Sequence, residues 1–239
     1  MLLCSIALFA NVKDFGGLRY RKAISTSVPE SAVDFIKNNH LEGNIYNDFV
    51  FGGYITWRLY PWKKTFIDTR SLNATVLSEA AWIYYARESL TDKPLSEGKS
   101  PLWEKLLDHY QVDIVMLDTL NVHGVLAPLV LKLLDSKTWV PLYADSLSVV
   151  FVRQAPNNRA TIENHRIEEG AVFSEIIERA KRGALMNRNN SNFLVSLGDI
   201  LSRIGHTDDA LRAYEFAAQR SPDDRTLTTK IEELKKKIY

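Results

Sequence analysis

The stretch between residues 191 and 224 constrains the fold of this chain more than any other part of the sequence. Small residues recur in it at Gly198 and Ala217 among large apolar ones, with Gly205 between them and Pro222 near the end. A small residue on each of two helices lets the helices approach closely. Glycine suits a chain reversal, and proline cannot continue the hydrogen-bond ladder of a helix. The spacing therefore predicts two helices folded back on each other.

The same stretch resembles the tetratricopeptide (TPR) repeat, a pair of antiparallel helices of roughly 34 residues. The resemblance implies a surface that binds proteins, not a catalytic centre. One repeat cannot bury its own apolar face. We therefore expect flanking helices, a partial one over 171–186 and a polar capping helix over 224–239, in a short array. The positions that carry the resemblance are Leu194, Leu197, Gly198, Leu201, Gly205, Ala210, Tyr214, Ala217 and Pro222, with Leu194 and Leu201 at positions where aromatic residues are common.

The part of the chain before this tail alternates between short apolar runs and helical patterns. Such alternation predicts strands and helices in turn, hence a parallel sheet covered by helices. The last two strands are close enough in sequence to form an antiparallel hairpin at one edge. The prediction is a three-layer, Rossmann-like α/β domain with a mainly parallel sheet. Its expected strands are 44–47, 65–68, 112–117, 139–143 and 147–152, and its expected helices are 31–36, 54–59, 78–88, 102–110 and 126–134.

Composition shifts divide the chain into an N-terminal leader (1–28), the α/β domain (29–155), a polar linker (156–168) and the helical tail (169–239). In the leader, Met1 to Val12 are apolar but fewer than the roughly 20 residues of a membrane-spanning helix. Three basic residues follow this run, the reverse of a signal peptide. Two interpretations stay open: a buried or interfacial helix, or the end of a transmembrane helix. The basic residues are Arg19, Arg21 and Lys22.

Charge and cysteine content exclude several classes of function. The chain has 30 basic and 29 acidic residues and a net charge of +1, so it lacks the basic excess of a nucleic-acid-binding protein. Cys4 is the only cysteine, which excludes a disulfide framework and a cysteine-based zinc site. Gly52-Gly53 lacks both the spacing of a dinucleotide fingerprint and the lysine of a P-loop. We therefore expect no cofactor.

Polar residues gather where the predicted strands end. In an open sheet with parallel strands, ligands bind beyond the carboxyl ends of those strands. His123 follows in the same region but has no second histidine or cysteine beside it, so it predicts no metal site. Structural roles are the alternative: Asp48 could cap a helix, and Asp68 could pair with Arg70. The candidate cleft residues are Asn47, Asp48, Gly52, Gly53, Tyr54, Asp68, Arg70 and Asp118.

The run from Pro29 to Arg70 resembles a recurrent sequence in bacterial polytopic membrane proteins of the glycosyltransferase-C kind. The resemblance implies an extracytoplasmic α/β domain attached to a membrane part, sometimes followed by tetratricopeptide repeats. In a more loosely similar group, the oligosaccharyltransferase catalytic subunits, the metal-binding acids lie between membrane helices, so this chain would lack a catalytic set. The residues that carry the resemblance are Pro29, Ala32, Phe35-Ile36, Gly43 to Asp48, Gly52 to Tyr54, Leu59 to Pro61, Phe66 to Asp68 and Arg70.

These observations lead to one expectation and two alternatives for function. The expectation is a non-catalytic accessory module, associated with a membrane through its N-terminus, extracytoplasmic, and bound to a protein partner through its TPR-like tail. The first alternative is a glycan-binding or glycosyl-transfer-related domain that uses the acidic cleft. The second is a purely cytoplasmic repeat scaffold.

Overall fold

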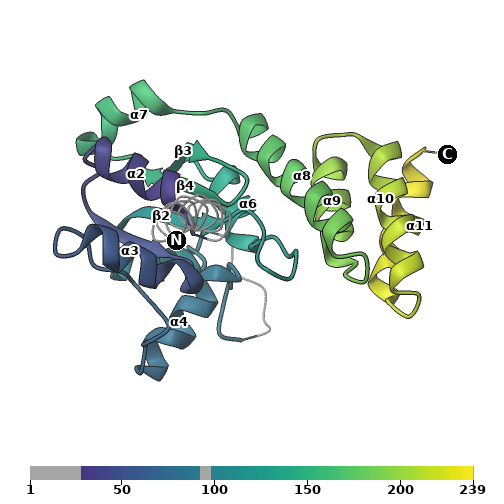
Figure 1. Ribbon diagram of the computed structural model, residues 1–239, viewed down its shortest axis with the longest axis horizontal. Coiled ribbons are helices and arrows are strands. Elements are labelled where there is room, and N and C mark those ends of the chain that lie inside the picture. Colours follow the sequence, from purple (N-terminus) through teal and green to yellow (C-terminus); the bar gives the residue numbers. More distant parts are fainter. Residues whose placement is uncertain (1–27, 92–97, 239) are drawn as a thin grey trace, which may run out of the picture.

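The computed structural model describes residues 28–91 and 98–238, so the expectations for the apolar N-terminal run and its basic cluster lie outside the described residues (Figure 1). A mixed α/β part comes first, and helices alone make up the rest. The first part holds α2 (Glu30–Asn38), β1 (Asn44–Asn47), η1 (Phe49–Phe51), α3 (Gly52–Leu59), α4 (Ala74–Tyr84), α5 (Leu102–His109), β2 (Val112–Asp118), α6 (Pro128–Asp135), β3 (Trp139–Ala144) and β4 (Ser148–Arg153). The second holds η2 (Pro156–Asn158), α7 (Arg159–His165), α8 (Glu169–Met186), α9 (Asn192–Arg203), α10 (Thr207–Arg220) and α11 (Arg225–Ile238).

The four strands form one mixed sheet in the order β1-β2-β4-β3. β1 pairs with β2 in parallel, with Asn47 opposite Met116. β4 pairs antiparallel with both β2 and β3. The expected α/β architecture and the closing hairpin are confirmed, but the prediction of a mainly parallel sheet is wrong. The hairpin brings β4, not β3, beside β2, so only the β1–β2 crossover makes a parallel pair.

Residues 65–68 are not a strand, although their sequence predicted one. The buried side chain of Asn47 explains this difference, because its amide satisfies the backbone of this segment. Asn47 Oδ1 accepts a hydrogen bond from the Phe66 N–H at 2.9 Å, and Asn47 Nδ2 donates to the Ile67 carbonyl at 2.8 Å. Buried backbone groups need partners, and here a side chain supplies them in place of a neighbouring strand.

Helices cover both faces of the sheet because successive strand residues point to opposite sides. In β2, Ile114 and Met116 pack in one core with α2 and α3, whereas Val115 and Leu117 pack in the other. The second core contains residues of α4, α5 and α6 and continues into α8, α9 and α10. The apolar core is thus shared between the sheet and the helical tail.

The helices predicted between residues 191 and 224 are present as α9 and α10. They pack against each other at Gly198, where an added Cβ would lie 2.4 Å from a ring carbon of Tyr214. Gly205, in the turn between them, has a φ of +81°, which glycine adopts without strain. The second helix ends at Arg220, before Pro222, as expected. In Figure 1 the tail extends to one side of the sheet, with α8 next to it and α11 farthest away.

The segment between the two parts packs on the sheet. The expected polar linker, 156–168, contains η2 and α7, and the Ile167 N–H after them donates to the Pro141 carbonyl of β3 at 3.0 Å. Arg179 of α8 then reaches the Ser146 carbonyl in the β3–β4 turn at 2.9 Å. Across the described ranges, no helix is both long and apolar enough to cross a membrane.

Candidate functional site

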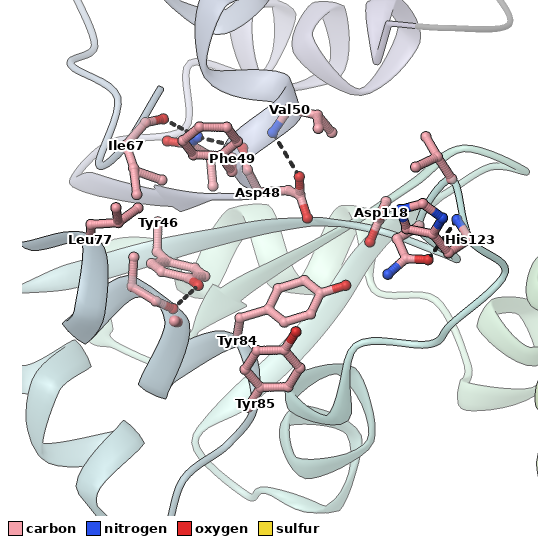
Figure 2. Close-up of a pocket in the computed structure, with 15 residues that line it drawn as sticks. Tyr46, Asp48, Phe49, Val50, Ile67, Leu77, Tyr84, Tyr85, Asp118 and His123 are labelled. Atoms are coloured by element: carbon pink, nitrogen blue, oxygen red, sulfur yellow. Dashed lines mark hydrogen bonds between the residues drawn. The ribbon is translucent and has the colours of Figure 1, made fainter. Parts of the chain in front are cut away.

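A pocket opens where the parallel strands β1 and β2 end. Asp48 directly follows β1, and Asp118 is the last residue of β2. The Asp48 N–H donates to the Met116 carbonyl at 3.0 Å, which keeps the two strand ends in register. Both carboxyl groups line a cavity of about 330 Å³. Figure 2 shows them turned toward the same space as the hydroxyl groups of Tyr84 and Tyr85. The remaining lining residues are Tyr46, Asn47, Phe49, Val50, Ile67, Leu77, Ala80, Ala81, Asn121, Val122 and His123.

Asp48 has a structural and an electrostatic role. Its Oδ1 accepts a hydrogen bond from the Val50 N–H at 2.9 Å and so caps η1, as the structural alternative predicted. The side chain is nevertheless buried and borders the cavity. Burial raises the pKa of this carboxyl above its usual range, and the hydrogen bond from Val50 opposes the rise.

Asp118 is the least satisfied polar group of the pocket. The residue is only 2% exposed, and its Oδ1 has no hydrogen-bond partner within the described part of the chain. Burial raises its pKa well above the usual range, and the nearby Asp48 raises it further. The guanidinium of Arg179 acts in the opposite direction. Leaving a buried carboxylate oxygen without a partner is costly, so this atom is available to a ligand.

Aromatic and apolar side chains form the walls and the rim. Tyr84 and Tyr85 at the end of α4 meet edge to face, with ring centroids 5.2 Å apart. Burial and the two aspartates raise the pKa of the Tyr84 hydroxyl, which stays protonated and can donate. The rim is exposed and apolar, so the pocket combines a polar floor with an apolar entrance. The exposed rim residues are Phe49, Val50, Leu77, Tyr85 and Val122.

The helical tail holds the loop that forms one side of the pocket. Ser196 Oγ of α9 donates to the Gly124 carbonyl at 2.7 Å. Asn190 Nδ2 donates to the His123 carbonyl at 2.9 Å. Gly124 has a φ of +78°, and an added Cβ would lie 2.7 Å from the ring of Phe193. The position of the pocket loop therefore depends on the tail.

The structure brings three of the predicted cleft residues together and places the other five elsewhere. Asn47, Asp48 and Asp118 line the pocket, although Asn47 is engaged with the backbone of residues 66–67. An added Cβ on Gly52 would lie 2.1 Å from the Ile67 carbonyl, so this glycine permits close packing. Gly53 has open space around it.

The remaining predicted residues form ion pairs or hydrogen bonds outside the pocket. Asp68 pairs with Arg70 at 2.5 Å, as the structural alternative predicted, and the Arg70 guanidinium lowers the pKa of this carboxyl. Tyr54 accepts a hydrogen bond from Arg58 on the next turn of α3. Neither Asp68 nor Tyr54 lines the cavity.

Sequence reasoning missed the residues that α4, the loop after β2 and α8 contribute. Tyr84 and Tyr85 lie in a stretch of sequence rich in aromatic residues, but nothing in that stretch places them opposite Asp118. Asn121 follows β2 closely enough that the strand-end rule could have included it. Arg179 lies far along the chain on an amphipathic helix, and only the packing of α8 brings it near.

The described residues contain no group of three or more His, Cys, Asp or Glu side chains placed to hold a metal ion. Comparison of the chain with protein-family models, curated proteins and solved structures finds no match in any of the three.

Proposed function

We propose that this chain is a non-catalytic accessory module whose α/β part binds a small hydroxylated ligand, a glycan unit, in the strand-end pocket. The observation that carries the proposal is the unpartnered Oδ1 of Asp118 at the bottom of a cavity of about 330 Å³. Pockets for small ligands usually measure about 300–1,000 Å³. A buried acceptor without a partner inside such a cavity is a place for a ligand donor.

The chemistry of the lining supports a sugar. Carboxylate oxygens accept hydrogen bonds from hydroxyl groups, and Asp48 and Asp118 supply them. Tyr84 and Tyr85 add aromatic surface on which the apolar face of a pyranose ring can pack. The pocket lies beyond the carboxyl ends of the two parallel strands, where ligands bind in open α/β sheets.

The test is a titration of the full chain with monosaccharides, followed by isothermal calorimetry and by amide chemical shifts. We expect saturable binding of at least one sugar, with shifts at residues 48–50, 84–85 and 118–123. Asp118→Asn should weaken that binding at least about 30-fold, the low end for removing one partner of a buried charged contact. Sugars that bind without shifts at these residues, or that bind the variant equally well, would contradict the proposal.

A second candidate function is binding of a protein by the tail, which we assign to the TPR type. The close contact at Gly198 and the small residue Ala217 on the facing helix support this assignment. Part of the tail is engaged already, since α9 packs on the pocket loop. The free surface includes Leu185, Met186 and Phe216, all strongly exposed. A partner identified by cross-linking in the native host should be lost with Leu185→Ser/Met186→Ser and retained with Asp118→Asn; the reverse would exclude this role.

We place the module at a membrane, outside the cytoplasm, as part of a glycosyltransferase-like membrane protein. The resemblance at Pro29 to Arg70 supports this placement, and so do three exposed aromatic side chains in and just after α3. Trp57, Tyr60 and Trp62 are 73%, 67% and 46% exposed, and such residues are enriched at membrane interfaces. The full chain should sediment with phosphatidylcholine vesicles, and Trp57→Ser/Trp62→Ser should reduce the bound fraction. Equal sedimentation of both proteins would remove these aromatic side chains from the proposal.

A further inference from the structure

We infer that the ligand of the strand-end pocket carries an ammonium group that binds between Asp48 and Asp118, so that the preferred glycan unit is an amino sugar. This inference rests on the proposed glycan binding and adds the chemical class of the sugar. It follows from the charges around the cavity, from the number of donors the floor requires, and from the aromatic walls.

The charges that face the pocket leave it negative. None of the residues lining the cavity is a lysine or an arginine. The charge of Arg179 on α8 acts on Asp118, yet within the described ranges the two form no ion pair. The same guanidinium is also shared with Asp145 of the β3–β4 turn. With a neutral ligand bound, the negative charge of the two buried carboxyl groups would be offset by the charge of Arg179, which is shared with Asp145. An ammonium group on the ligand would add a second positive charge beside them.

The floor needs more donors than one hydroxyl group can supply. Asp118 Oδ1 has no partner, and the described hydrogen bond of Asp48 uses its Oδ1, from Val50. An ammonium group has three donors, whereas a hydroxyl group has one. A single ammonium therefore has enough donors for both carboxyl groups, whereas a single hydroxyl group has not. Its hydrogen bonds would be charge-assisted, which makes each of them about twice as strong as a neutral one.

The walls suit a cation as well as a sugar ring. Tyr84, Tyr85 and Phe49 border the cavity, and the faces of aromatic rings attract cations, most strongly where water is excluded. Figure 2 shows Tyr84 and Tyr85 on the side of the cavity that faces the two aspartates.

Binding of an ammonium should depend on pH in a defined direction. Besides the two aspartates, the titratable or charged groups around the site are Tyr46, Tyr84 and Tyr85, His123 in the loop, and Arg179 on α8. The pKa values of Asp48 and Asp118 are raised, mainly by burial. An ammonium binds the ionised carboxylates, so its affinity should increase as the pH rises through these pKa values. It should fall again where the amine itself loses its proton.

Three matched sugars test the inference on the full chain. Glucosamine, N-acetylglucosamine and glucose differ only at the second carbon, which carries an ammonium, an amide or a hydroxyl group. We expect glucosamine to bind at least about 10-fold more tightly than either of the others near neutral pH, a difference of about 1.4 kcal/mol. Asp118→Asn should abolish this preference, and Asp223→Asn, at an exposed position on the tail, should leave it unchanged.

Benzylamine and benzyl alcohol test the ammonium group in the absence of a sugar ring, because they differ only in carrying an ammonium or a hydroxyl group. If benzylamine binds in the pocket and no sugar does, the ammonium site stands and the glycan proposal fails. If the three sugars bind equally, the glycan proposal stands and the ammonium inference is overturned. If no probe binds at concentrations up to about 10 mM, both are overturned, because such affinity would be weaker than about −3 kcal/mol.

Discussion

The polar side chains of the α9–α10 hairpin have hydrogen-bond partners, whereas the strand-end pocket contains a buried polar atom without one. In the hairpin, the Tyr214 hydroxyl donates to Asp199 at 2.5 Å, and Lys230 of α11 pairs with the same carboxylate. Ser191 and Ser221 bond to each other at 2.8 Å. In the pocket, Asp118 keeps an oxygen without a partner beside a second buried carboxyl group.

The difference shows which region is built for stability and which for binding. A satisfied polar network fixes one packing arrangement. An unsatisfied buried acid destabilises the folded chain, and such groups concentrate at functional sites. The hairpin also supports the pocket, since α9 holds the loop after β2 through Ser196 and Phe193. We therefore expect mutations in the hairpin to reduce stability, and mutations at the pocket floor to reduce binding while stability rises.

The largest effect is expected at the closest contact of the hairpin. Gly198→Ala would place a methyl group 2.4 Å from the buried ring of Tyr214, whose hydroxyl is fixed by Asp199. Overpacking of this kind typically costs about 1–3 kcal/mol, and we expect the upper end, measured by urea unfolding. Gly170→Ala in α8 is the control, because nothing lies within 4 Å of the added Cβ. Helix propensity should make the control neutral or slightly stabilising. Equal losses in the two variants would show that the Gly198 contact is not tight.

At the pocket floor, Asp118→Asn should stabilise the fold by about 1–2 kcal/mol while it weakens ligand binding, since it deletes a buried charge whose Oδ1 lacks a hydrogen-bond partner. The sign follows from the raised pKa of Asp118 in the folded chain. In the wild type, the stabilising contribution of Asp118 is fully present below the pKa of the unfolded state, about 4. It is lost as the pH rises toward the pKa of the folded state.

The melting temperatures of the wild type and of Asp118→Asn should therefore converge at low pH and separate as the pH rises above about 4. Asp223→Asn, an exposed substitution, should show no such divergence. A variant less stable than the wild type at neutral pH would mean that Asp118 has a structural partner in solution.

The sequence predicted most helices and strands because their signals are local. The run Val112 to Leu117 is apolar except at Asp113, as expected of a strand buried on both faces, and the spacing around Gly198 and Pro222 defines the hairpin. The predictions failed where residues far apart in the sequence determine the local structure. Residues 65–68 have a strand-like sequence, but the Asn47 amide takes their backbone hydrogen bonds. Likewise, β4 lies beside β2 and β3 lies at the edge, an order that periodicity along the chain does not encode.

Residues of the candidate site were predictable only from the rule that ligands bind beyond the carboxyl ends of parallel strands. That rule gave Asp48 and Asp118, which follow or end parallel neighbours. It also gave Asp68 and Arg70, because residues 65–68 have the sequence of a third parallel strand. The structure has no such strand there, and the pair lies outside the cavity. Tyr84 and Arg179 come from helices whose packing directions depend on the whole core. No local pattern specifies such a direction.

The coupling between the hairpin and the pocket should be measurable at Ser196. Ser196→Ala removes the buried hydrogen bond to the Gly124 carbonyl and should cost about 1 kcal/mol of stability. Ligand affinity should fall at most about fivefold, the equivalent of that free energy, because the loop carrying Asn121 and His123 loses one of its anchors. Ser174→Ala, at an exposed position of α8, is the matched control. Reduced stability with unchanged affinity would mean that the tail supports the fold without positioning the pocket.

The smallest effect is expected at Arg70, a predicted cleft residue that the structure places outside the pocket. Its guanidinium bonds Asp68 and lowers the pKa of that carboxyl, so Arg70→Ala should leave the affinity for glucosamine unchanged. The Asp68–Arg70 ion pair should affect only the pH dependence of the stability of the fold. A carboxyl group whose pKa is lowered in the folded state stabilises the fold at pH values above its unfolded pKa, about 4. This contribution is lost as the pH falls through the folded pKa. The melting temperatures of the wild type and of Arg70→Ala should therefore differ slightly at neutral pH and converge in acid, the reverse of the behaviour expected for Asp118→Asn. If Arg70→Ala instead lowers ligand affinity, the ligand extends beyond the pocket to the Asp68–Arg70 pair, and the acidic site is larger than its cavity.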